Sequence, residues 1–181
     1  SYAAILSQLG ISYTSQGWFQ NAEPLLKEAL AIYKNVYGEK HPDYADTLEN
    51  LADLYQSQGQ YEKAEPLIIE ALEIRKQVFG IKHLQYSNSV RQLAQNYLQR
   101  GLHAQAEPLY KEVLDIAREK YGEKHTQSAV SLNSLGAFYI GKRMHAKAEP
   151  LAKAAIVIIE DYLEQTAAIQ SESSQMATSA T

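Results

Sequence analysis

The residues best suited to metal binding or proton transfer in this chain are its five histidines, and their spacing argues against both roles. They form two sets with a 42-residue spacing, which are His41, His83 and His125, and His103 and His145. On repeated helix pairs, members of one set would lie about 10 Å apart or more, and the two sets would lie at opposite helix ends. Zinc requires ligand nitrogens about 2.0–2.1 Å from one ion. We therefore predict no metal site and interpret these histidines as helix caps or loop residues.

Carboxylates recur in the same way, in a Glu-Pro pair that occurs four times, at Glu23, Glu65, Glu107 and Glu149. Four equivalent carboxylates on four separate units do not converge as a general acid and base must. A Glu-Pro pair suits the start of a helix, where a carboxylate meets the positive end of the dipole and Pro is tolerated. The chain has no Cys, no glycine-rich phosphate loop, no His-Glu-x-x-His and no Gly-x-Ser-x-Gly. We predict no catalytic residue, no cofactor and no enzymatic activity.

Composition and charge narrow the class of partner. The 181 residues carry a net charge of −4, whereas nucleic-acid binding needs a clustered surplus of Lys and Arg. The longest unbroken apolar run, residues 154–159, is far shorter than the roughly 20 residues of a membrane-spanning helix. We expect neither nucleic acid nor a membrane as partner, and we expect a cytoplasmic location. The chain begins with Ser1 rather than Met, which leaves open a removed leader or further upstream sequence.

An internal repeat supplies the elements that position these residues. The tetrapeptide Ala-Glu-Pro-Leu begins at residues 22, 64, 106 and 148, always 42 residues apart. This period divides the chain into repeats 1–42, 43–84, 85–126 and 127–165, with a polar tail at 166–181. A single 42-residue unit is too small to build a sufficient core, whereas stacked units bury one continuous core.

Each repeat contains the pattern of two helices, and the second repeat shows it most clearly. Leu48, Leu51, Ala52 and Tyr55 have the i, i+3, i+4, i+7 spacing of one helical stripe. Gly59 then ends this helix, and a second amphipathic helix runs on to Gly80. Because the chain contains no alternating β-type run, we predict an all-α fold of four helical hairpins.

These residues resemble a known repeat family. The stripe from Leu48 to Tyr55, together with Ala64 and Ile68, resembles the tetratricopeptide repeat, with Leu in place of the usual Trp. The 42-residue period and the stretches 51–55, 59–67 and 80–83 resemble the kinesin-light-chain type of that repeat. The resemblance covers about residues 1–165. It implies a right-handed superhelical solenoid, the TPR superhelix, whose first helices line a concave groove that binds proteins or peptides.

A second stripe remains on each first helix once the core positions are removed, and we expect it to face the groove. Its amides can donate and accept hydrogen bonds at once, which suits a peptide backbone. The alternative is that these positions are merely solvated. The candidate groove residues come from this stripe and from the column of residues beside it, and they are Gln8, Ile11, Asp46, Glu49, Asn50, Asp53, Asn88, Arg91, Gln92, Gln95, Asn133 and Ser134.

The charge of this stripe predicts the chemistry of the partner. The kinesin-light-chain groove is expected, by resemblance, to receive acidic cargo with basic residues, but this stripe contains no Lys or Arg. Arg91 lies beside it, and the negative charge is centred on Asp46, Glu49 and Asp53. We therefore expect a protein or peptide ligand that is neutral or basic where it meets the second repeat.

The last repeat departs from the pattern. Arg143 replaces the glycine of the inter-helix turn, so we expect either a strained turn there or a break shifted to Gly141. The final helix is apolar nearly all round, which requires cover from a second copy of the chain or from the polar tail. We predict self-association through Val157 and Ile159, and we expect the tail to be weakly structured. The main hypothesis is a protein-interaction module, and the alternative is a structural assembly unit that acts through its terminal helices.

Overall fold

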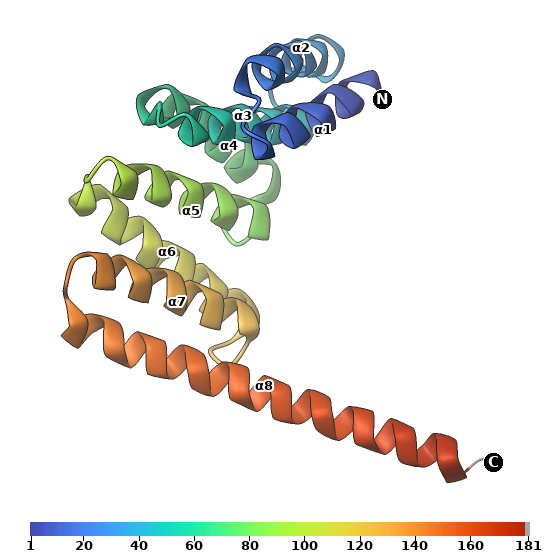
Figure 1. The fold of residues 1–181 in the computed structure, drawn as a ribbon, viewed down its shortest axis with the longest axis vertical. Coiled ribbons are helices and arrows are strands. Elements are labelled where there is room, and N and C mark those ends of the chain that lie inside the picture. Colours follow the sequence, from blue (N-terminus) through green and yellow to red (C-terminus); the bar gives the residue numbers. More distant parts are fainter. Residues whose placement is uncertain (180–181) are drawn as a thin grey trace. The chain divides into compact units, whose positions relative to one another are not determined.

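Eight α-helices and no strand form the described part of the chain, which is the backbone of residues 1–179 and the side chains of residues 1–170 in a computed structural model (Figure 1). The first helix of each hairpin is α1 (Tyr2–Ser15), α3 (Pro42–Ser57), α5 (Leu84–Gln99) or α7 (Thr126–Gly141). The second is α2 (Phe19–Tyr37), α4 (Tyr61–Phe79), α6 (His103–Tyr121) or α8 (His145–Ser179). The predicted all-α repeat fold is confirmed.

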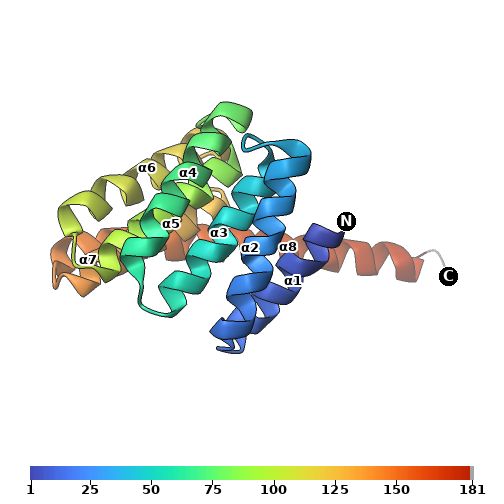
Figure 2. The same cartoon turned by 90° about the horizontal axis from the view of Figure 1, so that it is seen from above.

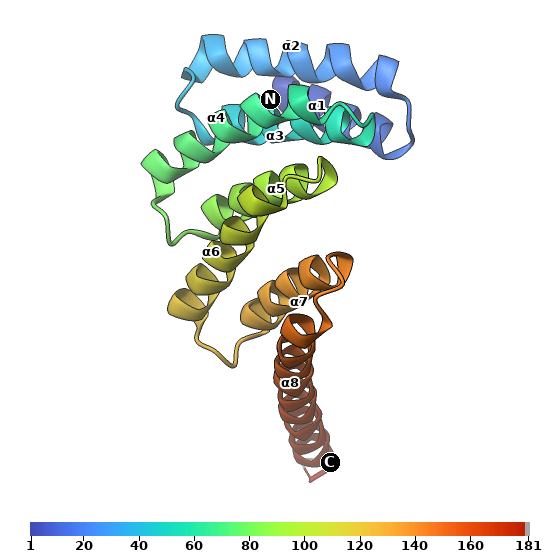
Figure 3. The same cartoon turned by 90° about the vertical axis from the view of Figure 1, so that its left-hand side faces the viewer.

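The chain forms two compact units, Ser1–Val113 and Leu114–Thr181. In the first unit, α1 and α2 form a hairpin that packs on α3 (Figure 2). The hairpin of α3 and α4 packs in turn on α5 (Figure 3). In the second unit α7 packs along the first half of α8, whose C-terminal half extends beyond α7 (Figure 1). The same repeat sequence therefore produces the same hairpin in both units.

The core of the first unit lies between consecutive hairpins. Leu26, Leu54 and Ile68 are fully buried in one cluster, which joins α2, α3 and α4. Leu48 belongs to a neighbouring cluster that also includes Leu6 of α1. Because each cluster draws on several helices, no hairpin of this unit buries its apolar stripe alone.

The predicted histidine caps are confirmed. His41, His83 and His125 are the N-caps of α3, α5 and α7, and each Nδ1 accepts a hydrogen bond from the backbone N–H two residues later, at 3.1–3.3 Å. Each ring also stacks on the last aromatic ring of the preceding helix, with centroids 4.6–4.8 Å apart, on Tyr37, Phe79 or Tyr121. The histidines thus fix the connection from one hairpin to the next.

The turn inside the last hairpin has the backbone of the glycine turns, with an arginine in the left-handed position. Gly59 lies just beyond α3 with φ of 74°, and the next N–H donates back to the Tyr55 carbonyl at 2.8 Å. Arg143 has φ of 57°, and the Met144 N–H donates to the Tyr139 carbonyl at 2.9 Å. The strained turn that the sequence predicted is therefore present, and the break does not shift upstream to Gly141.

The Glu-Pro pairs lie directly after the first turn of their helices. Since α4 begins at Tyr61, Pro66 is its sixth residue and lies inside the helix. The equivalent prolines of α2, α6 and α8 are also inside their helices. The pair thus lies near the first turn, as the sequence predicted, and Glu65 also contacts the next hairpin.

Candidate binding face of the first helices

The candidate residues of the first unit line hollows between neighbouring first helices. Between α1 and α3 lies a hollow of about 200 Å³, which Gln8, Ile11, Asp46 and Asn50 line together with Tyr33 of α2 and others. Between α3 and α5 lies a hollow of about 360 Å³. Its lining is Glu49, Asp53, Gln56, Asn88, Arg91, Gln92 and Gln95. An adjoining hollow of about 460 Å³ shares Asp53, Gln56 and Gln95.

The remaining two candidates lie in the second unit, in a hollow of different chemistry. Asn133 and Ser134 line a space of about 440 Å³ between α7 and α8. Apart from these two residues and Glu160, its walls are apolar, being Ala129, Val130, Ala152, Ala155, Ile156 and Ile159. The structure thus assigns all twelve candidates to hollows, ten to polar ones in the first unit and two to an apolar one.

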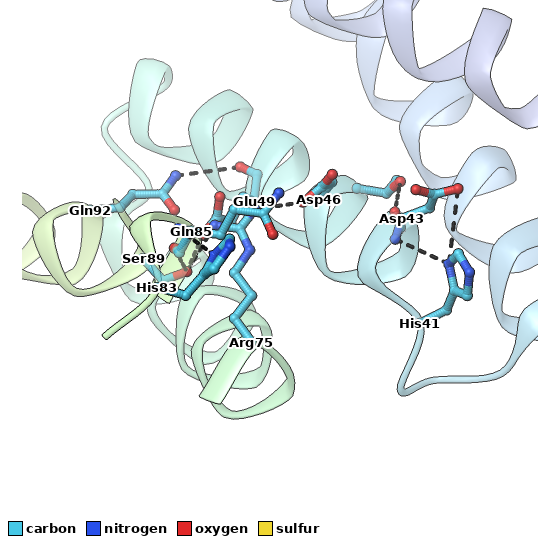
Figure 4. Close-up of polar contacts among 10 residues, drawn as sticks. His41, Asp43, Asp46, Glu49, Arg75, His83, Gln85, Ser89 and Gln92 are labelled. Carbon is cyan, nitrogen blue, oxygen red and sulfur yellow. Dashed lines mark hydrogen bonds and ion pairs between the residues drawn. The ribbon is translucent and has the colours of Figure 1, made fainter. Parts of the chain in front are cut away.

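A buried arginine that the sequence prediction missed joins α4 to α3 and α5 (Figure 4). Arg75 of α4 is only 5% exposed. Its guanidinium lies 2.6 Å from the Asp46 carboxylate and 2.7 Å from the Glu49 carboxylate. It also donates to the Ser89 hydroxyl at 3.0 Å and to the Gln85 carbonyl at 3.1 Å. The negative charge predicted for the second repeat is therefore largely paired within the protein.

A signal for this arginine exists in the sequence. Arg75 continues the i, i+3, i+4, i+7 stripe that holds Ile68, Ala71 and Leu72. A charged residue on the apolar stripe of a helix is rarely buried without a partner of opposite charge. That partner is provided by carboxylates on the first helix of the same hairpin.

Burial governs the ionisation of the two acids in the α3–α5 hollow. Desolvation raises the pKa of Glu49, and the Arg75 guanidinium and the Ser89 hydroxyl partly oppose this effect. Desolvation also raises the pKa of Asp53, against a hydrogen bond from the Gln92 amide at 2.5 Å. Both carboxylates therefore retain protons to higher pH than free side chains do.

The amides of this hollow are only partly engaged by the protein. Gln95 accepts a hydrogen bond from the Tyr110 hydroxyl at 2.9 Å, and Asn88 accepts one from Arg91 at 2.8 Å. Among the side chains that the structure describes, Gln56 Nε2 and Gln92 Oε1 are buried without a hydrogen-bond partner. These two amides therefore retain a donor and an acceptor that the protein does not use, beneath the surface of the hollow.

The repeated glutamates hold consecutive hairpins together. The Tyr55 hydroxyl of α3 donates to Glu23 of α2 at 2.9 Å. One repeat later, the Tyr97 hydroxyl of α5 donates to Glu65 of α4 at 3.0 Å, and Arg100 also pairs with Glu65. Glu23 and Glu65 are thus junction residues between consecutive hairpins.

The two residues predicted for self-association face different surroundings on α8. Ile159 lines the apolar hollow against α7, whereas Val157 is 55% exposed and is not part of that hollow. The tail does not form the weakly structured segment that its composition suggested, because α8 continues as a helix to Ser179. Ile169 of this extension is exposed, and Met176 lies outside the described side chains.

Two kinds of site are absent from the described residues. No group of three or more His, Cys, Asp or Glu side chains in this part of the chain could hold a metal ion. No helix in the described range is both long and apolar enough to cross a membrane.

The family is shown by comparison of the sequence with known repeat families. A sequence model of the tetratricopeptide repeat matches residues 1–77, 47–119 and 90–161. The chain belongs to the tetratricopeptide repeat family. No curated protein sequence matches it.

Several solved structures share this fold. BtubC (BKLC) from P. vanneervenii has a TM-score of 0.79 and 22% identity, and the match covers 88% of this chain and 64% of BtubC. A putative kinesin light chain from Podosopora anserina, with nearly identical TPR-like repeats, has a TM-score of 0.68 and 25% identity over 93% of this chain and 75% of that one. A Rap protein, solved with Competence and Sporulation Factor, has a TM-score of 0.74 and 18% identity over 90% of this chain and 44% of that one.

These comparisons bear on both the type of repeat and the class of protein. The likeness to kinesin-light-chain repeats that the sequence predicted is confirmed. The tetratricopeptide repeats indicate a protein-interaction scaffold. The chain spans less than two thirds of BtubC and less than half of the Rap protein.

Proposed function

We propose that the first unit binds a peptide or an extended protein segment along the face formed by α1, α3 and α5. The observation that carries this proposal is the row of polar hollows on the first helices, which the candidate residues line. The hollow between α3 and α5 has a volume of about 360 Å³, which is room for a few ligand residues. Solvated positions on a convex helix surface would not border such hollows.

The chemistry of the α3–α5 hollow favours recognition of a peptide backbone. Gln56 Nε2 can donate to a ligand carbonyl and Gln92 Oε1 can accept from a ligand N–H once a rotation of each amide brings these buried atoms to the surface of the hollow. Leaving both atoms unpaired in a buried position costs free energy that a bound peptide group would recover. This pairing recognises the backbone, so the side chains of the ligand set specificity through the hollows on either side.

The ion pairs within the protein narrow the charge that we expect of the ligand. Asp46, Glu49 and Asp53 bring three carboxylates to this face, and the guanidinium groups of Arg75 and Arg91 lie among them. The face is therefore only weakly acidic. We propose a ligand that is neutral along most of its length. If the ligand carries a basic side chain, that side chain lies opposite Asp53. The cytoplasmic location expected from the sequence is part of this proposal.

A peptide array combined with a solution titration tests the proposal. We expect neutral and weakly basic peptides to be enriched, and we expect Gln92→Ala and Asn50→Ala to weaken their binding about five- to thirtyfold, since each removes a polar contact worth about 1–2 kcal/mol. The matched control is Gln77→Ala, which removes an exposed amide on α4 that lines none of these hollows. Enrichment of acidic peptides, or equal loss in the control, would contradict the proposal.

A second candidate function rests on the ends of the chain. Val157 and Ile159 remain accessible on α8, as do several other large apolar side chains of the terminal helices. Exposed apolar surface of this extent marks sites of association. We propose, as the alternative, a structural assembly unit that self-associates through its terminal helices.

A further inference from the structure

The hollow of about 460 Å³ that adjoins the α3–α5 hollow lies at the C-terminal ends of both helices. We call it the C-terminal hollow, because Ser57 and Gln99, the last residues of α3 and α5, both line it. Its volume is in the range of ligand pockets. The other lining residues are Asp53, Gln56, Gln95 and Tyr61.

The C-terminal hollow carries a negative charge. Asp53 is the only charged residue among the described residues that line it. The negative ends of two helix dipoles meet there as well, and neither α3 nor α5 has a basic residue in its last turn. Arg100 follows α5 directly, but its guanidinium pairs with Glu62 and Glu65 of α4. The charge of this hollow therefore favours a cationic group.

Asp53 has no partner of opposite charge within the described part of the chain. Its carboxylate accepts a hydrogen bond from the Gln92 amide, and no cation there pairs with it. Although the carboxylate is accessible from the hollow, the walls around it displace enough water to raise its pKa. Glu49 on the same helix, in contrast, is paired with Arg75. Of the two acids in the α3–α5 hollow, Asp53 is therefore the one whose charge a ligand can neutralise.

We propose that the C-terminal hollow receives one lysine or arginine side chain of a bound peptide and that Asp53 selects it. The amide oxygens of Gln56, Gln95 and Gln99 can accept hydrogen bonds from the remaining N–H groups of an ammonium or guanidinium group. The ring of Tyr61, on the same wall, can also attract a cation. This inference rests on the peptide binding proposed above and adds the position and charge of one ligand residue.

Arg91 keeps this basic side chain out of the neighbouring hollow. It lines the α3–α5 hollow but not the C-terminal hollow. Its guanidinium donates to the Asn88 side chain, and no carboxylate of the described residues pairs with it. A second cation beside this guanidinium would be repelled. The basic residue of the peptide is therefore directed toward the C-terminal ends of α3 and α5, which fixes the orientation of the peptide.

The repeat contains this acid only once. At the position of Asp53, α1 has Ile11, α5 has Gln95 and α7 has Ala137. A peptide recognised by its backbone alone can bind shifted by one repeat, because the polar stripe recurs on the next first helix. A carboxylate at one of these equivalent positions discriminates against the shifted arrangement, since it leaves the basic side chain without its partner. Asp53 thus fixes the register of the peptide.

Calorimetric titration of the 181-residue chain with capped peptides tests the proposal. The peptides are acetylated and amidated, are built on the neutral sequence most enriched on the array, and carry lysine, arginine, glutamine, glutamate or norleucine at each position in turn. We expect lysine or arginine at one position to bind about 10- to 150-fold more tightly than norleucine, the range for one hydrogen bond to a charged group. Glutamate at that position should weaken binding.

Variants of the chain assign this preference to Asp53. Asp53→Asn should lose the preference for lysine or arginine over norleucine, because it removes the charge and keeps the shape. Unfolding cannot explain that loss, since burial of the charge makes the asparagine variant the more stable protein at neutral pH. The matched control is Asp115→Asn, the same charge change at an exposed position of α6 that lines neither hollow. Adding Gln99→Asp to Asp53→Asn returns a carboxylate to the C-terminal hollow and should restore the preference.

Several outcomes would overturn the proposal. Equal affinities of the lysine, arginine and norleucine peptides at every position exclude a basic subsite, while the proposed peptide binding stands. A preference that survives Asp53→Asn, or that Asp115→Asn also removes, means that Asp53 does not select the basic side chain. A double variant that does not regain the preference assigns the loss to the Asp53–Gln92 hydrogen bond. Absence of binding by every peptide overturns the proposed function itself and this inference with it.

Discussion

The α3–α4 hairpin and the α7–α8 hairpin have the same length of repeat, yet they present different chemistry at the same positions. Arg75 of α4 is buried and ion-paired, and the equivalent residue of α8 is Ile159, which lines an open apolar hollow. Ala52 and Gly59 of the first hairpin correspond to Gly136 and Arg143 of the last. The comparison teaches that one backbone unit can carry either a closed polar junction or an open apolar surface.

The reason lies in the helix that packs against each hairpin. α5 packs on α4 and supplies Ser89 and the Gln85 carbonyl to Arg75, so both terminal nitrogens of this buried cation have partners, whereas its Nε has none in the described part of the chain. At Ile159 the hollow contains no comparable set of acceptors among the described residues that line it. A charge in that position would lack such partners, whereas an apolar side chain gains from any helix that covers it.

The largest expected effect on stability comes from removing Arg75, the buried cation between α4, α3 and α5. Arg75→Leu leaves Glu49 buried without its guanidinium partner, and we expect a loss of about 3–5 kcal/mol in the free energy of unfolding. Urea unfolding monitored by circular dichroism measures this loss. Lys76→Leu, at the neighbouring exposed position of α4, is the control and should change stability little. A loss below about 1 kcal/mol would mean that the junction does not depend on Arg75.

The turn of the last hairpin should become more stable when it acquires the glycine of the others. Arg143 has φ of 57°, and a non-glycine residue in this region costs about 1–2 kcal/mol. Arg143→Gly should therefore raise the free energy of unfolding. This gain is reduced because the added glycine makes the unfolded chain more flexible. Thermal unfolding of Arg143→Gly and of Lys142→Gly gives the comparison, since Lys142 has φ of −86° and gains nothing from glycine. Equal effects of the two changes would argue against strain at Arg143.

A smaller gain in stability should result from giving α7 the alanine that α3 has at the equivalent position, Ala52. A Cβ added at Gly136 would lie 3.7 Å from Leu151, which is an ordinary contact, so Gly136→Ala should stabilise α7 by about 0.5–1 kcal/mol. At the equivalent Gly10, the added Cβ would lie 2.7 Å from Leu26, and Gly10→Ala should destabilise the protein. Chemical unfolding of both variants should show opposite signs, and a common sign would refute this difference in packing.

The smallest effect concerns the pH dependence of the polar hollow. Burial raises the pKa of Asp53, so the folded state keeps this proton to higher pH than the unfolded chain. The contribution of Asp53 to stability is therefore present near its ordinary pKa of 3.8 and is lost as pH rises through the raised value. Asp53→Asn, which can still accept from Gln92, should be more stable than wild type at neutral pH. Unfolding measured across pH should show this advantage shrinking toward pH 3.8, and a constant difference would contradict the pKa assignment.

The fold and the histidine N-caps could be predicted from the sequence. A stripe such as Leu48, Leu51, Ala52 and Tyr55 defines which side of α3 is buried, because a helix has a fixed period. The 42-residue spacing also placed His41 and His83 at equivalent helix starts, where both are N-caps. These features depend on contacts between residues close together in the chain.

The position of the candidate residues could be predicted in outline, but the ion pairs around them could not. The candidate residues line hollows as expected, since the first-helix stripe is set by the same period. Arg75 was overlooked because its partners lie 26 and 29 residues away on α3 and 14 residues away on α5. Val157 and Ile159 were grouped by their apolar nature, although two residues of separation places them on nearly opposite sides of a helix.

By itself, the sequence determined the repeat, the helices and the stripe that each helix presents, because these depend on periodicity and on the conformations that Gly, Pro and capping residues favour. Only the tertiary structure decided which of the charges are paired, which amides remain open and which apolar faces are left uncovered. Those outcomes depend on the distance between side chains of different helices, and electrostatic and hydrogen-bond energies change steeply over that distance.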